Sequence, residues 1–123
     1  MKPDIRVKRV YDPAAADDGA RVLVDRLWPR GVTKAAATLT LWLKDIAPTS
    51  DLRKWFGHDP ERWPEFRRRY HAELDKNRAA VERLNVLVAA GPVTLVYGAH
   101  DTAHNQAVAL ADYMRARTDR DPG

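Results

Sequence analysis

The sequence predicts one α/β domain with a mostly parallel, four-stranded sheet and helices packed on it, in a Rossmann-like layered arrangement. Short apolar, β-branched segments alternate along the chain with segments of helical periodicity. The last apolar segment is followed at once by a helix with a capping residue, which is typical of parallel sheets. A length of 123 residues fits one domain. We expect it to span residues 1–117, with residues 118–123 as a flexible polar tail.

Two strands are expected in the first quarter of the chain. Residues 5–11 alternate apolar and basic side chains with a period of two, which indicates a strand with one solvated face. Residues 12–19 hold proline, aspartate and glycine and predict a loop. Residues 21–28 open with a compact apolar run and predict a more buried strand, which the turn at residues 29–31 ends.

The middle of the chain predicts shorter elements followed by long helices with apolar stripes at helical spacing. In order, we expect a short helix over residues 34–37 capped by Thr33, a third strand over 39–46, a helix from Ser50 or Asp51, and one kinked or two consecutive helices over 60–90, begun by Asp59 and Pro60.

The last strand is expected over residues 93–99, an apolar run bounded by turn residues and typical of a strand buried on both faces. Asp101 or Thr102 is expected to cap the final helix. This places His104 in the first helical turn, where backbone N–H groups and the helix dipole favour an anion.

Composition excludes several classes of site. The chain has no cysteine, so a disulfide framework, a thiolate-bound metal and a cysteine nucleophile are excluded. No apolar run reaches the length of a signal peptide core or a membrane span, which predicts a soluble, cytoplasmic protein without a membrane partner. The glycine fingerprints of dinucleotide and nucleoside triphosphate sites and the G-x-S-x-G elbow are absent, so we expect no cofactor.

The net charge of +4 is compatible with an anionic partner. Basic and acidic residues are interspersed, however, which favours a solvated surface over a nucleic-acid footprint. Arg67, Arg68 and Arg69 are the densest basic cluster, and Glu65 and Glu73 lie one helical turn to either side of Arg69.

Four sequence blocks carry a resemblance to a known family. They read R-V-L-V-D-R-L-W-P-R-G (21–31), L-W-L-K-D-I-A-P (41–48), W-F-G-H-D-P (55–60) and T-L-V-Y-G-A-H-D-T-A-H-N-Q-A (94–107). In these blocks and their order the chain resembles the YeaO-like family, a bacterial domain of unknown function. The resemblance covers nearly the whole chain and implies no established activity. A more distant branch of the domain is similar but has a His-Cys-His-Arg run where this chain reads His104-Asn105-Gln106-Ala107, so only the first His is kept.

The parallel sheet predicts where a site lies, because ligands of such folds bind beyond the carboxyl ends of the strands. Asp25, Tyr97 and His104 are the candidate proton-transfer groups there. Trp28 beside a basic turn could stack on a planar ligand. The candidate binding residues at these strand ends are Arg9, Tyr11, Arg26, Trp28, Arg30, Lys44, His100 and Asn105.

Two local alternatives accompany this hypothesis. Asp25 and Arg26 interrupt an apolar run, so they face a pocket, reach solvent, or form a structural ion pair with no ligand. His100 and His104 are four residues apart, but His100 precedes the helix and no carboxylate-rich motif completes a set, so we expect no metal.

Three functions stay open at this point. The chain is a small enzyme or pocket protein that binds an anionic small molecule, a nucleic-acid or protein-binding module that uses the Arg-rich helix, or a protein with a purely structural ion-pair network. The order of the strands, the substrate and the oligomeric state are not given by these patterns.

Overall fold

The computed structural model describes residues 3–120, and residues 1–2 and 121–123 lie outside the described part. It confirms the α/β class with a four-stranded, entirely parallel sheet. The elements are β1 (Ile5–Arg9), η1 (Ala16–Asp18), β2 (Ala20–Leu23), α1 (Lys34–Ala37), β3 (Leu41–Trp42), η2 (Lys44–Ile46), α2 (Ser50–Phe56), η3 (Pro60–Arg62), α3 (Trp63–Lys76), α4 (Arg78–Ala90), β4 (Val93–Tyr97) and α5 (Gln106–Arg120), where η marks a 3₁₀ helix.

The strand order is β1-β4-β2-β3, so the last strand lies in the middle of the sheet. Every residue of β4 is buried, as its continuous apolar sequence predicts. Leu95 pairs with Val7 on one side and with Val22 on the other. All four carboxyl ends therefore point to one edge of the molecule.

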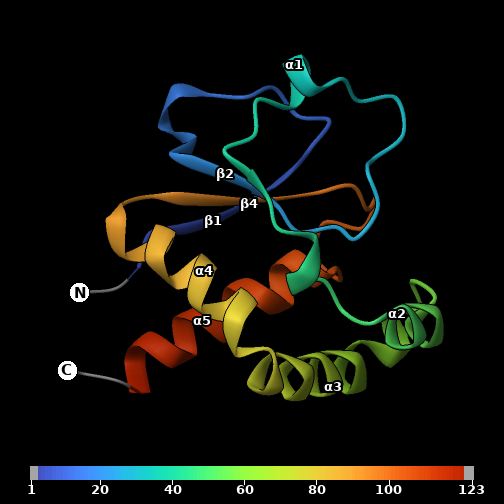
Figure 1. Ribbon diagram of the computed structural model, residues 1–123. Coiled ribbons are helices and arrows are strands. Elements are labelled where there is room, and N and C mark those ends of the chain that lie inside the picture. The colour runs from blue at the N-terminus through green and yellow to red at the C-terminus, as the bar shows by residue number, and fades with distance from the viewer. Residues whose placement is uncertain (1–2, 121–123) are drawn as a thin grey trace.

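The two faces of the sheet are covered differently (Figure 1). The helices α3, α4 and α5 lie on one face, where α5 contacts β1 and β4 and α3 packs against α5. Phe66, Tyr70 and Leu110 belong to this larger core. The other face carries α1 and long loops over a smaller core that includes Leu23 and Val96.

Several expected boundaries differ from the structure. The third strand is only two residues long, because the chain turns into η2 after Leu43. The Leu43 N–H still donates to the Leu23 carbonyl of β2. Over residues 60–90 the second of the two expected forms is found, because α3 and α4 are consecutive helices that meet at Asn77. Helix α5 runs through the expected domain boundary at residue 117 to Arg120, and the remainder of the expected tail, residues 121–123, is outside the described part.

Helix starts follow the capping chemistry of the sequence. Thr33 caps α1 as expected, since its hydroxyl oxygen accepts the Ala36 N–H. Thr49, not Ser50 or Asp51, caps α2, and Asp59 caps the 3₁₀ turn that leads into α3. None of the described helices has the length and apolar character needed to cross a membrane.

Candidate functional site

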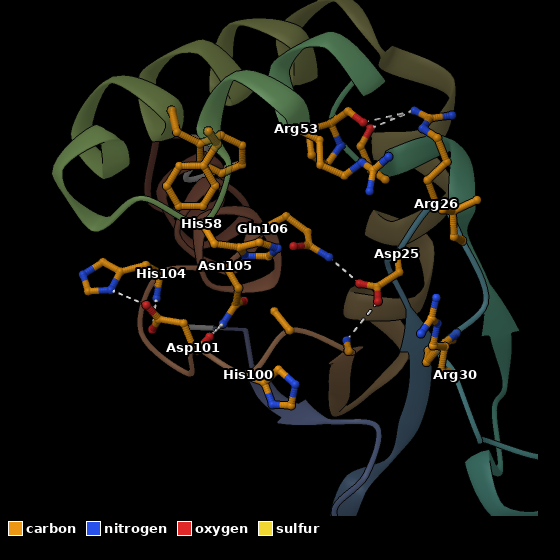
Figure 2. Close-up of a pocket in the computed structure, with 18 of the residues that line it drawn as sticks. Asp25, Arg26, Arg30, Arg53, His58, His100, Asp101, His104, Asn105 and Gln106 are labelled. Carbon is orange, nitrogen blue, oxygen red and sulfur yellow. Dashed lines mark hydrogen bonds and ion pairs between the residues drawn. The ribbon is translucent and has the colours of Figure 1, made fainter.

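A cavity of about 550 Å³ lies at the carboxyl ends of β2 and β4, bordered by α2 and the start of α5 (Figure 2). Its volume is in the range of small-molecule sites. The residues that line it are Tyr11, Asp25, Arg26, Leu27, Trp28, Pro29, Arg30, Ala47, Pro48, Arg53, Phe56, His58, Phe66, Gly98, Ala99, His100, Asp101, His104, Asn105 and Gln106.

The cavity brings together most of the residues that the sequence analysis selected. Arg9, Lys44 and Tyr97 are the exceptions. The predicted residues that line the cavity are Tyr11, Asp25, Arg26, Trp28, Arg30, His100, His104 and Asn105.

Asp25 is the carboxylate at the centre of this group (Figure 2). It follows β2, and its Oδ2 accepts the backbone N–H of Gly98 over 2.9 Å. Its Oδ1 accepts a hydrogen bond from the side-chain amide of Gln106. Burial raises the pKa of Asp25 to about 6, against these two hydrogen bonds and the charge of Arg53, which all lower it. The carboxyl group thus changes charge near neutral pH.

Arg26 does not form an ion pair with Asp25, which was one of the open alternatives. Its terminal nitrogen donates to the carbonyls of Ala47 and Pro48, at 3.2 and 3.3 Å. The Nε of Arg26 is buried without a hydrogen-bond partner among the described residues. Arg26 thus turns toward the loop between η2 and α2. The alternative of a structural pair is therefore wrong for these two residues.

A buried ion-pair network does exist around Asp18, away from the cavity. The carboxylate of Asp18 contacts Arg21 at 2.6 Å and Lys8 at 2.8 Å. Asp18 and Arg21 are each 3% exposed. None of these three side chains lines the cavity at the strand ends.

Two further arginines line the cavity. Arg30 follows the second strand, and its backbone carbonyl accepts the hydroxyl of Tyr11. Arg53 comes from α2 and was missed by the sequence analysis, because the position of α2 against the strand ends depends on tertiary packing. Its charge lowers the pKa of Asp25, against the larger effect of burial. Within the described part of the chain, neither guanidinium group forms an ion pair.

The loop before α5 is held by Asp101. Its Oδ1 accepts the N–H groups of Ala103 and His104, and its Oδ2 accepts the His104 imidazole Nδ1–H over 2.9 Å. These hydrogen bonds hold the pKa of Asp101 below its usual range, the Ala103 N–H contributing most. The pair orients the His104 ring, whose centroid lies 5.4 Å from that of Trp63.

The expected start of the last helix is wrong by several residues. The helix begins at Gln106, and Asn105 is the capping residue, since its Oδ1 accepts the Val108 N–H. His104 therefore lies before the helix and not in its first turn. Asp101, expected as the cap, instead closes a turn that ends where the helix begins.

The histidines do not assemble into a metal site. His104 is paired with Asp101, and the Nδ1 of His100 lies 3.4 Å from a terminal nitrogen of Arg9. Among residues 3–117, no three His, Cys, Asp or Glu side chains are grouped to hold a metal ion. His58 also lines the cavity, from the turn after α2, with a positive φ of 58°.

The other predicted residues have structural contacts of their own. Arg9 donates to the Ala99 carbonyl and lies over the ring of Tyr11. Lys44 lies over the ring of Trp42. Tyr97 is 3% exposed, and burial raises the pKa of its hydroxyl.

Trp28 lines the cavity but is held by two contacts. Its indole N–H donates to the Val32 carbonyl over 2.7 Å, and its ring meets the edge of the Trp42 ring. The indole N–H is thus already engaged, which leaves its apolar surface for the cavity.

The three arginines of α3 form ion pairs with acidic side chains of the protein. Arg68 and Arg69 both contact the carboxylate of Glu65, at 2.6 and 2.8 Å, while Arg67 contacts Asp112. Glu73 does not join them, because its carboxylate accepts from the backbone and hydroxyl of Thr49.

Comparisons with known proteins identify the family of this chain. A family model described as "Inactive DUF488-N3 subclade" matches residues 4–122. The chain belongs to this family. It is 44% identical to the "Uncharacterized protein YeaO" of Escherichia coli over 92% of this chain and 98% of the relative. It is 42% identical to the uncharacterised proteins Mb3100c of Mycobacterium bovis and Rv3073c of Mycobacterium tuberculosis, over 92% of this chain and 95% of each relative. These matches confirm the YeaO-like resemblance, and no solved structure matches.

Proposed function

We propose that this domain binds a small anionic molecule in the cavity at the carboxyl ends of the strands. The observation that carries the proposal is the position of Arg26, Arg30 and Arg53 around one cavity. In the described part of the chain these three guanidinium groups form no ion pair, whereas Arg67, Arg68 and Arg69 on α3 all do. An anionic ligand would supply the missing charge partner.

The acidic groups of the cavity do not neutralise these arginines. Asp101 is occupied by its own loop and by His104. Asp25 is a single carboxyl group beside three guanidinium groups, and burial raises its pKa to about 6. The cavity therefore keeps a positive potential, which favours anions.

We favour binding of this molecule without a reaction, because the family model is described as inactive. The residues before and at the start of α5 also favour binding without a reaction. Where the distant branch has a cysteine, this chain has Asn105, which caps α5; where that branch has its second His, Gln106 donates to Asp25.

A second candidate is a small acid–base enzyme. Asp25 favours it, because a carboxyl group with a pKa of about 6 inside a cavity can accept or donate a proton at neutral pH. His104, held by Asp101, would be the second proton-transfer group. Tyr97 is less suitable, because it is buried and does not line the cavity.

The nucleic-acid alternative has less support. It uses the arginines of α3, whose charges are met by Glu65 and Asp112. A salt-dependent gel shift with random oligonucleotides tests it, since phosphate contacts lose affinity steeply as salt rises.

A thermal-shift screen of anionic metabolites tests the main proposal. A ligand of the cavity raises the melting temperature of the parent and not of Arg30→Gln/Arg53→Gln. The matched control is Arg68→Gln/Arg69→Gln, which removes two exposed arginines of α3 and should respond like the parent. A ligand that stabilises the cavity variant as much as the parent would refute the proposed site.

A further inference from the structure

We infer that the cavity takes a planar heterocycle that carries two adjacent N–H donors at one end and an anionic group at the other. The two donors would meet the carboxylate of Asp25, and the anionic group would meet Arg30 and Arg53. This inference rests on the proposed function and names the class of molecule bound. Guanine nucleotides and carboxylated pterins share this chemistry, because both present an N–H beside an exocyclic amino group on a flat ring.

The free acceptor positions of Asp25 indicate which chemical group of the ligand would contact it. A carboxylate has two oxygens with about four acceptor positions in total. In Asp25 the Gly98 N–H occupies one position on Oδ2, and the Gln106 amide occupies one on Oδ1. Each oxygen therefore keeps one position for a further donor. A pair of parallel N–H groups fits two such oxygens, as in other bidentate contacts.

The donors of the ligand should be neutral. Arg26, Arg30 and Arg53 line the same cavity as Asp25. A guanidinium or ammonium ligand at Asp25 would meet repulsion from these groups. A neutral lactam N–H and amino group would not, and they would stabilise the charged form of the half-buried carboxyl group.

The walls of the cavity suit a flat ring. Apolar and aromatic side chains line it, among them Trp28, Pro48 and Phe56, of which Phe56 is largely buried. Phe56 is fixed by stacking on Phe66, with ring centroids 4.3 Å apart. Flat apolar surfaces of this kind bind heterocycles by stacking and burial.

The arginines indicate where the anionic group of the ligand would lie. Arg30 and Arg53 approach the cavity from opposite sides of Asp25 in Figure 2, Arg30 from the segment after β2 and Arg53 from α2. A cavity of about 550 Å³ is much larger than a phosphate ion needs. A ligand that extends from Asp25 to one or both guanidinium groups uses both the space and the charge.

Calorimetric titration with a matched set of probes tests the inference. GMP and pterin-6-carboxylate carry both ends, ribose 5-phosphate carries only the anion, guanosine carries only the donor pair, and AMP carries an anion on a purine without the donor pair. We expect GMP, pterin-6-carboxylate or both to bind about tenfold or more tightly than AMP and ribose 5-phosphate. Preference for GMP over the pterin, or the reverse, identifies the source of the shared chemistry.

Variants locate the two ends. Asp25→Asn replaces one acceptor oxygen by a donor and removes a negative charge, so it should abolish the preference for GMP or the pterin without weakening the binding of ribose 5-phosphate. Arg53→Gln should weaken all anionic probes, whereas Arg69→Gln on α3 should weaken none. If all phosphates bind equally and Asp25→Asn changes nothing, the inference is overturned while the proposed anion site stands. If no anionic probe binds the parent, both are overturned.

Discussion

Gly98 lies so close to the Asp25 carboxylate that a side chain at position 98 would have to displace it. The Gly98 N–H donates to Oδ2 of Asp25 over 2.9 Å, and a Cβ on Gly98 would lie 2.9 Å from the same oxygen. Real Cβ atoms essentially never come so near another atom. The glycine after β4 thus permits the hydrogen bond that fixes the carboxylate after β2.

Gly98→Ala should displace the Asp25 carboxylate and destabilise the fold by about 1–3 kcal/mol, as overpacking at a tight contact does. Gly91→Ala is the control, because a Cβ there has no atom within 4 Å. Chemical denaturation of both variants measures the difference. Equal stability of the two variants would contradict the close packing of Gly98 on Asp25.

Asp25 should make the protein less stable as the pH rises. Its folded-state pKa of about 6 lies above the ordinary 3.8, so its contribution is fully present below about pH 4 and is lost as the pH rises through 6. The loss should be about 1–3 kcal/mol. Asp25→Asn removes this dependence, since an amide does not titrate.

The measurement is the free energy of unfolding of the parent and of Asp25→Asn between about pH 4 and pH 7. The difference between the two curves isolates Asp25 from the other acids. A constant difference over this range would show that the pKa of Asp25 is not raised.

Asp18 should act in the opposite direction. Its hydrogen bonds from Lys8 and the Ala15 N–H, with that from Arg21, lower its pKa from 3.8 to about 2. Its stabilising contribution is therefore present above about pH 4 and is lost as the pH falls through 2. Asp18→Asn should cost about 3–5 kcal/mol near neutral pH, because it leaves the buried charge of Arg21 uncompensated.

Asp17→Asn is the matched control for Asp18. The Asp17 side chain is 77% exposed and pairs with Arg6 at the surface, so its loss should cost less than about 1 kcal/mol. Urea denaturation of both variants compares them. Similar costs at positions 17 and 18 would argue against a buried network at Asp18.

Tyr70 should anchor the wall of the cavity near Pro48. Its buried hydroxyl donates to the Ile46 carbonyl over 2.6 Å, just before Ala47 and Pro48. Tyr70→Phe leaves that carbonyl unsatisfied and should cost about 1–3 kcal/mol in unfolding free energy. Tyr11→Phe, at a residue that is 46% exposed, should cost less. The opposite ranking in a thermal melt would refute this anchor.

The sequence predicts the fold class well because its strongest signals are local. The continuous apolar run of β4 and the aromatic stripe of α3 both specify buried elements without reference to the rest of the chain. The short β3 shows the limit of this approach. Alternating residues over 39–46 are compatible with a strand, but pairing to β2 extends only to Trp42 before η2 begins.

The candidate site is predictable to the extent that it follows from strand ends. Asp25 and Arg30 are found in this way, because both lie in the segment that follows β2 at the carboxyl edge of the sheet. Arg53 and Gln106 are not, since their arrival at Asp25 depends on how α2 and α5 pack. The available signal for Gln106 was its position two residues after His104, at the start of the helix that follows β4.

An NMR titration of backbone amides with GMP and with inorganic phosphate tests the central claim most directly. The Gly98 amide reports on the cavity through its hydrogen bond to Asp25, and the amides of residues 67–69 report on the Arg-rich helix. The account predicts saturable shifts at Gly98 and around Arg53, with residues 67–69 unchanged. Shifts confined to residues 67–69, or none at any residue, would contradict an anion site at the carboxyl ends of the strands.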